Sequence, residues 1–131
     1  MNPSPTVIIV DDDDDDRRLI REAFHLFNSG ITFLEAFDGK EAIALLDSLD
    51  NEPSLILVDL NMPVMNGLEM ITEIRSRQSS TPMALISTSL GPEMVQQALE
   101  IGANCCYIKP VKYEELCSLA HQLLRRFLPG N

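Results

Sequence analysis

Short apolar runs alternate with longer amphipathic segments along nearly the whole chain, and this alternation constrains the fold more than any other feature. The runs are rich in β-branched residues and stop abruptly at polar ones, which is typical of buried strands. The segments between them repeat apolar residues every three or four positions, which is typical of helices. The predicted strands are 7–10, 31–37, 55–58, 84–86 and 105–108, and the predicted helices are 15–27, 41–49, 68–74, 93–101 and 113–127.

Strands that alternate with helices are joined by right-handed crossovers, which favour a parallel sheet covered by helices on both faces. The sequence therefore predicts an α/β, doubly wound fold with five strands and five helices. Its 131 residues suit one domain, since a single core usually takes about 100–150 residues, and we expect one domain over 1–131 with a core over 6–128. In such sheets the functional site lies at the carboxyl ends of the strands.

Composition and charge disfavour two classes of partner. Ten basic and twenty acidic residues give a formal net charge of −10, whereas nucleic acid attracts clustered Lys and Arg. No stretch approaches the roughly 20 apolar residues of a membrane span, and the first residues lack the pattern of a signal peptide. Cys105, Cys106 and Cys117 are odd in number and lack metal-ligand spacing, which is typical of reduced thiols. We expect a cytoplasmic protein that binds neither nucleic acid nor a membrane.

Polar residues stand at four of the predicted strand ends and should converge on one edge of the sheet. Asp11 and Asp12 follow the first strand, Asp59 the third, Ser87 the fourth, and Lys109 the last. Carboxylates packed beside a buried strand repel one another unless a cation joins them. Mg²⁺ is the natural candidate because it prefers oxygen ligands, and the lysine supplies a second positive charge. Taken singly, the serine and the lysine are also compatible with ordinary strand-end residues.

The acidic run 11–16 admits two further interpretations. Residues 14–16 suit the exposed first turn of a helix, where the helix dipole favours carboxylates that face water. The run also resembles a calcium-binding EF-hand loop, because Asp11, Asp13, Asp15 and Glu22 fall at loop positions one, three, five and twelve. Asp16, however, occupies the sixth position, where that loop needs glycine, and helical apolar spacing continues through the segment. The sequence therefore argues against calcium.

These residues also form a set of motifs that resembles a known family. The motifs are Asp11-Asp12-Asp13, Asp59-Leu60-Asn61-Met62-Pro63, Asn66-Gly67, Ser87-Thr88, Gly102-Ala103 and Lys109-Pro110. In order and spacing they resemble the response-regulator receiver domains of two-component signalling. The resemblance covers nearly the whole chain, and the loop after Asp59 and the Lys-Pro pair are its most specific parts.

The resemblance implies a flavodoxin-like receiver fold with strand order 2-1-3-4-5 and a signalling domain rather than a conventional enzyme. It implies that Asp59 is the phosphoacceptor and that Mg²⁺ is held by Asp11, Asp12, Asp59 and the backbone carbonyl of Asn61. It also implies that two residues bind the phosphoryl oxygens, namely Ser87 and Lys109. The implied partners are a sensor histidine kinase or a histidine phosphotransfer protein, and a downstream target protein.

Two residues depart from the family pattern. Cys106 stands three positions before Lys109, where the family commonly has a Tyr or Phe that changes rotamer on signalling. Tyr107 comes one position late, and because side chains alternate across a strand it cannot replace that aromatic residue. Thr88 is bulkier than the small residue usual after the switch hydroxyl. Both departures concern how the signal is output rather than the identity of the phosphoacceptor.

Two other functional classes stay open. A phosphatase of the haloacid dehalogenase type would use Asp11 and Asp13 after the first strand, but Asp15 stands where its motif usually has Thr or Val, and the length leaves no room for a cap segment. A receiver-like binding module that works without phosphorylation is the other alternative. The last predicted helix ends near residue 127, so we expect output by protein contact, although a stand-alone regulator and a domain cut from a longer one would look alike.

Overall fold

Strands and helices alternate along residues 4–129, the part of the chain that the computed structural model describes. The strands are β1 (Thr6–Val10), β2 (Thr32–Ala36), β3 (Leu55–Asp59), β4 (Met83–Ser87) and β5 (Cys105–Ile108). The helices are α1 (Asp14–His25), α2 (Gly39–Ser48), α3 (Gly67–Ser76), α4 (Pro92–Ile101) and α5 (Tyr113–Phe127). The predicted alternation of five strands and five helices is confirmed within this range.

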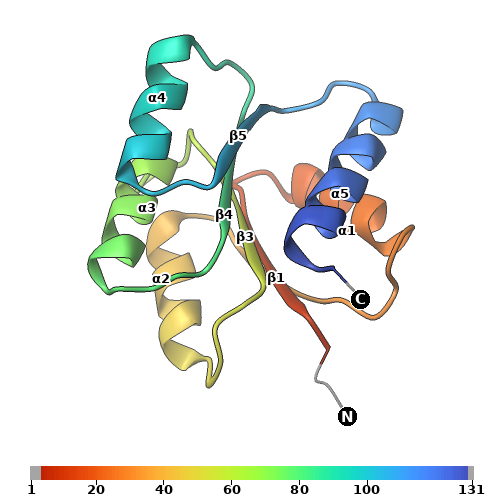
Figure 1. The fold of residues 1–131 in the computed structure, drawn as a ribbon, viewed down its shortest axis with the longest axis horizontal. Helices are drawn as coiled ribbons and strands as arrows, with labels where there is room; N and C mark the ends of the chain where they lie inside the picture. Colours follow the sequence, from red (N-terminus) through yellow and green to blue (C-terminus); the bar gives the residue numbers. More distant parts are fainter. Residues whose placement is uncertain (1–3, 130–131) are drawn as a thin grey trace.

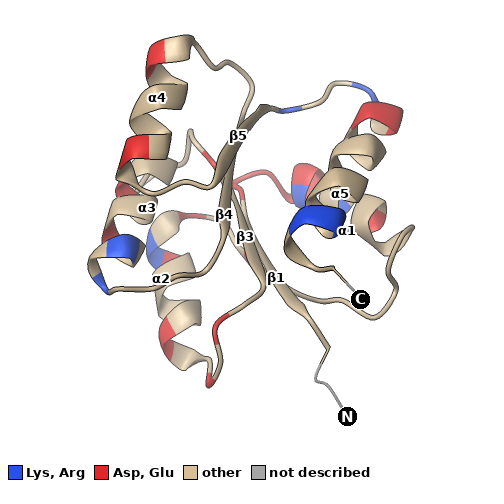
Figure 2. Cartoon of the chain, in the orientation of Figure 1, with Lys and Arg blue, Asp and Glu red and all other residues tan. Residues whose placement is uncertain are grey.

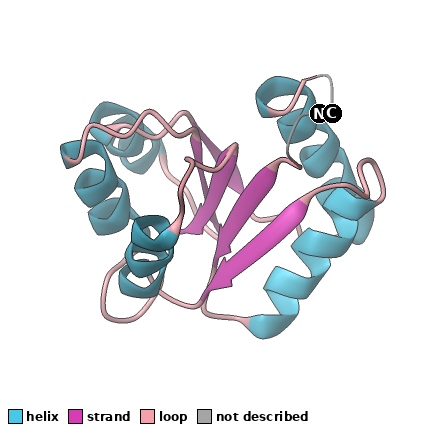
Figure 3. Ribbon diagram, turned by 90° about the horizontal axis from the view of Figure 1, so that it is seen from below, coloured by secondary structure: helices cyan, strands magenta, loops and turns pink. Residues whose placement is uncertain are grey.

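All the strands are parallel and form one sheet in the order β2-β1-β3-β4-β5. This order confirms the predicted doubly wound, flavodoxin-like architecture. The register aligns the carboxyl ends of neighbouring strands, with Val10 opposite Val58, Asp59 opposite Ile86, and Ser87 opposite Ile108. In Figure 3 the strands lie side by side between the helices that cover the two faces of the sheet. Residues that follow these strand ends therefore lie along one edge of the sheet.

Helices cover both faces of the sheet, with α1 and α5 on one side and α2, α3 and α4 on the other (Figure 1). Side chains of β1 alternate between the two resulting cores, so that Val7 and Ile9 pack toward α1 and α5 while Ile8 and Val10 pack toward the opposite helices. Every residue of β3 and β4 is buried. Burial on both faces explains why these strands read as continuous apolar runs.

Several element boundaries differ from the sequence prediction because of local capping. Gly39 begins α2 instead of standing in the preceding turn, since the Asp38 side chain accepts a hydrogen bond from the Glu41 backbone at 2.8 Å. Gly67 begins α3, where Asn66 and Glu69 form a reciprocal capping box. The first helix ends at His25, two residues before its predicted end.

Successive side chains of β5 point to opposite faces of the sheet, as expected for a strand. Cys105 and Tyr107 pack toward α1 and α5, whereas Cys106 packs into the opposite core. Tyr107 therefore does not occupy the place of an aromatic residue at position 106, as predicted. Cys105, Cys106 and Cys117 are all free thiols, which also agrees with the prediction. Within residues 4–129, no helix has both the length and the apolar character needed to cross a membrane.

Candidate functional site

The acidic residues after β1 have different structural roles. Figure 2 shows acidic residues gathered where β1 leads into α1. Asp11 is buried, and its backbone N–H donates to the Ala36 carbonyl at 3.0 Å, which extends the β1–β2 ladder by one residue. Its carboxylate accepts a hydrogen bond from the Asp13 backbone at 2.9 Å. Asp13 in turn caps α1 by accepting from the Asp16 backbone at 2.9 Å. The strand end and the helix start are thereby fixed relative to each other.

Asp59 ends β3 inside the same edge of the sheet and is only 7% exposed. The loop that follows is held close, because the Leu60 N–H donates to the Ile86 carbonyl at 3.2 Å and the Gly67 N–H donates to the Leu60 carbonyl at 3.0 Å. A Cβ atom at position 67 would lie 2.6 Å from the Asp59 carbonyl oxygen. Glycine is therefore required where the loop returns to the strand end.

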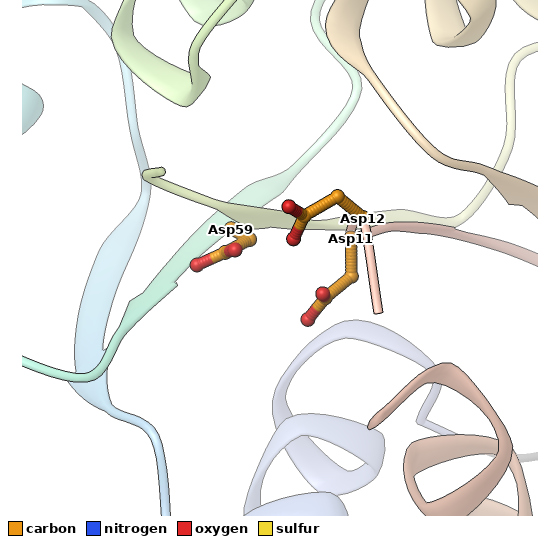
Figure 4. Close-up of side chains that lie close together, drawn as sticks. All are labelled: Asp11, Asp12 and Asp59. Atoms are coloured by element: carbon orange, nitrogen blue, oxygen red, sulfur yellow. The ribbon is translucent and has the colours of Figure 1, made fainter. Parts of the chain in front are cut away.

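The structure brings Asp11, Asp12 and Asp59 together, as Figure 4 shows. One carboxylate oxygen from each residue lies within 4.8 Å of the other two. Asp11 and Asp59 are buried, whereas Asp12 is exposed, so the group opens to solvent on one side. All the donors are carboxylate oxygens, which suit a hard cation such as Mg²⁺ that keeps part of its water shell. The predicted set of acidic ligands thus fits the ion chemically.

Lys109 reaches this group from the end of β5. Its ammonium nitrogen lies 2.8 Å from Asp11 Oδ2, 2.9 Å from Asp16 Oδ2 and 3.9 Å from Asp59 Oδ1. Its backbone N–H donates to the Ser87 carbonyl at 2.7 Å, which ties the ends of β4 and β5. The lysine therefore lies beside the acidic residues, where the strand-end argument predicts it.

Asp16 is the one residue at this site whose surroundings the sequence misjudged. It was expected to face water with the rest of the first helical turn, but its carboxylate forms an ion pair with Lys109. Asp14 and Asp15 do face solvent. One signal was available in the sequence, because aspartate is a favoured N-cap residue: with Asp13 as the cap, as the structure shows, Asp16 occupies the third helical position. The helix that begins at Asp14 also excludes a calcium-binding loop over this run, as expected.

Burial and charge shift the pKa values of the site. The pKa of Asp59 is raised from an ordinary value of 3.8 to about 6, chiefly by burial; the Lys109 charge opposes this rise, and the charges of Asp11 and Asp12 add to it. Burial likewise raises the pKa of Asp11 above its ordinary value, although Lys109 again opposes the effect. Burial alone would lower the pKa of Lys109, but its hydrogen bonds to Asp11 and Asp16 hold it above the ordinary value.

Two further candidate residues lie at or just after the ends of β4 and β3. Ser87 is fully buried at the end of β4, where its hydroxyl donates to the Ser89 carbonyl at 3.1 Å. Asn61 lies two residues after Asp59 in the exposed part of the loop. The roles of Ser87 toward a phosphoryl group and of the Asn61 carbonyl toward a metal stay predictions.

Comparisons with known proteins point to one family. The family model described as the response regulator receiver domain matches residues 7–121. The nitrate/nitrite response regulator protein NarL of Escherichia coli K12 is 42% identical over 88 residues, which are 67% of this chain and 40% of that protein. The chain thus matches less than half the length of this curated relative.

Two solved structures resemble nearly the whole chain, each covering 97% of it and 96% of the solved chain. One is the phosphorylated cyanobacterial phytochrome response regulator RcpA, with a TM-score of 0.87 and 27% identity. The other is the Mn²⁺-bound form of the response regulator Rcp1, with a TM-score of 0.81 and 25% identity.

Proposed function

Because the chain belongs to the response regulator receiver domain family, we propose that Asp59 accepts a phosphoryl group in a Mg²⁺-dependent reaction. The donor is a sensor histidine kinase or a histidine phosphotransfer protein, and the phosphorylated domain signals by contact with a target protein. One observation carries the proposal: Asp59 is a buried carboxylate that shares a cluster with Asp11 and Asp12 and lies 3.9 Å from the Lys109 ammonium. We further propose that residues 1–131 form a single receiver domain with its core over 6–128.

The transfer needs an ionised acceptor that is held in place. A carboxylate oxygen of Asp59 forms the new bond to phosphorus while the bond from phosphorus to the donor imidazole nitrogen breaks, and the imidazole leaves with that electron pair and takes a proton from water. With a pKa of about 6, Asp59 is mostly ionised at neutral pH. Its position at the end of β3, followed by a loop that is hydrogen-bonded to Ile86, provides the orientation that in-line transfer requires. Lys109 offsets the negative charge that the phosphoryl group brings.

Asp11, Asp12 and Asp59 would hold the metal ion, and we propose the Asn61 carbonyl as a fourth protein ligand. When bound, Mg²⁺ supplies positive charge that offsets repulsion between the acceptor carboxylate and the incoming phosphoryl oxygens. The related proteins support this proposal, since Rcp1 was solved with Mn²⁺ and RcpA in phosphorylated form. The three free cysteines are consistent with a reducing compartment such as the cytoplasm.

Output in this proposal depends on the Ser87 hydroxyl. To reach a phosphoryl oxygen on Asp59, the hydroxyl gives up its hydrogen bond to the Ser89 carbonyl, and this exchange biases the loop that leads into α4. Cys106 is too small to report the change by swinging between exposed and buried rotamers. The signal is therefore expected to leave through the β4–α4 loop.

The test is mass spectrometry of the protein after incubation with acetyl phosphate and Mg²⁺. We expect one phosphoryl adduct on Asp59, lost on adding a chelator and absent in Asp59→Asn. Lys109→Ala should still take the label but transmit the signal poorly. An adduct on Asp11 would instead support the phosphatase alternative, and target binding without any adduct would support a phosphorylation-independent module.

A further inference from the structure

Lys109 makes its closest side-chain contacts with carboxylates other than the proposed phosphoacceptor. Its ammonium group donates to Asp11 at 2.8 Å and to Asp16 at 2.9 Å, whereas Asp59 lies at 3.9 Å, beyond hydrogen-bond distance. Two of the three ammonium hydrogens are thus engaged away from Asp59. Asp11 belongs to the proposed metal ligands, but Asp16 has no part in the proposed chemistry.

The position of Asp16 is fixed by the start of α1. Its backbone N–H is bound by the Asp13 cap at 2.9 Å, so its side chain projects from a defined point of the first turn. The adjacent acids project elsewhere, because Asp14 pairs with Arg17 and Asp15 pairs with Arg18. Among the three acids of this turn, Asp16 alone pairs with Lys109.

We propose that Asp16 is a positioning residue that holds the Lys109 ammonium away from Asp59 in the unphosphorylated protein. The inference rests on the proposed role of Asp59 as the phosphoacceptor. A phosphoryl group on Asp59 places new anionic oxygens beside Lys109, and these oxygens compete with Asp16 for its hydrogens. The Asp16 carboxylate also repels the added negative charge. Both effects favour the unphosphorylated state, so loss of the Asp16 charge should favour the phosphorylated one.

The experiment uses beryllofluoride, which bonds to a carboxylate oxygen and resembles a tetrahedral phosphoryl group. Its affinity in the presence of Mg²⁺ is measured by titration calorimetry on the full chain. Asp16→Asn should bind it about two- to fivefold more tightly than wild type, the size expected for a partly exposed ion pair. Asp16→Glu keeps the carboxylate and should restore affinity close to that of wild type.

Asp15→Asn is the matched control, because it removes the same charge one residue earlier. Asp15 is largely exposed and pairs with Arg18 at 3.7 Å, so its loss leaves the contacts of Lys109 intact while also removing a favourable interaction between a first-turn carboxylate and the helix dipole. Affinity in Asp15→Asn should stay within about twofold of wild type, the change expected for an exposed pair. If Asp15→Asn gained as much affinity for beryllofluoride as Asp16→Asn, the effect would come from net charge alone, and the inference would be wrong.

A second readout needs no ligand. Nitrogen NMR of the Lys109 ammonium group should show its hydrogens exchanging faster with water in Asp16→Asn, and slowly again in Asp16→Glu. If wild type fails to bind beryllofluoride in Mg²⁺, the proposed function itself is wrong and this inference falls with it. If wild type binds but Asp16→Asn shows neither tighter binding nor faster exchange, only the role of Asp16 is wrong.

Discussion

Replacing Asp59 with asparagine should stabilise the metal-free protein at neutral pH. In the folded state the Asp59 carboxyl has a pKa of about 6, and its ordinary value is 3.8. The ionised form is therefore disfavoured by folding, because the carboxylate is buried beside Asp11 and Asp12. Each pKa unit corresponds to about 1.4 kcal/mol, so a shift of about two units gives an upper limit near 3 kcal/mol.

The sign of this effect fixes its pH dependence. Below about pH 3, well under the ordinary pKa of 3.8, Asp59 is protonated in both the folded and unfolded states and contributes no penalty. As the pH rises toward 6 and beyond, the unfolded chain loses the proton more readily than the folded one, so wild type loses stability relative to Asp59→Asn. We expect the advantage of Asp59→Asn to grow from near zero at about pH 3 to about 1–3 kcal/mol at about pH 8.

Urea unfolding in EDTA at both pH values measures this difference. Asp50→Asn is the control, because it removes one negative charge from an exposed residue that precedes the start of β3, whereas Asp59 lies at the opposite end of that strand. Added Mg²⁺ should reduce or reverse the advantage, since a ligand that binds the folded wild type stabilises it by mass action. Equal stability of wild type and Asp59→Asn at about pH 8, or an advantage that does not change with pH, would refute the electrostatic account.

Three more outcomes are expected. Asp12→Ala should weaken Mg²⁺ binding in calorimetry, and equal affinity would remove that residue from the ligand set. Ser87→Ala should abolish the gain in target affinity on phosphorylation, while Cys106→Ala should change only packing; the reverse pattern would assign the switch to the cysteine. Gly67→Ala should lower the free energy of unfolding by about 1–3 kcal/mol, because its Cβ would lie 2.6 Å from the Asp59 carbonyl oxygen, and unchanged thermal unfolding would show that the loop can move aside.

The fold could be predicted closely because each strand and helix is marked by a pattern within its own stretch of sequence. Buried parallel strands appear as apolar runs, and their ends are marked by polar residues such as Asp11 and Asp59. The end of the first helix was harder, since apolar spacing continues to Phe27 after the helix ends at His25. Phe27 is still used for packing, because its ring stacks on His121 of α5 at 4.6 Å. Periodicity reports that a side chain packs, but not whether its backbone is helical.

The candidate site was predictable only in part because its contacts are not local. Strand order brings the strand-end residues to one edge, which was sufficient to place Asp11, Asp12, Asp59 and Lys109 together. The pairing of Asp16 with Lys109 joins residues 93 positions apart and depends on how far α1 is turned about its axis. The apolar stripe of α1 indicates which side of the helix faces the sheet, but not closely enough to place a single polar side chain of the first turn. The rotation is set by packing of the helix against β1 and α5.

Because all the strands run in the same direction, the loops at the two ends of the strands differ in how much change in length and sequence they can accept. Every residue of the proposed site comes from the edge where the strands end. The loops at the other edge connect each helix to the start of the next strand and contribute no residue to the proposed site. There Arg75 joins α3 to the β5 side by donating to the Gly102 carbonyl at 3.0 Å and to Asn104 at 3.0 Å. Loops at that edge can be lengthened or exchanged wherever this clasp is kept. A lineage could therefore vary one edge of the sheet while its signalling chemistry stayed the same.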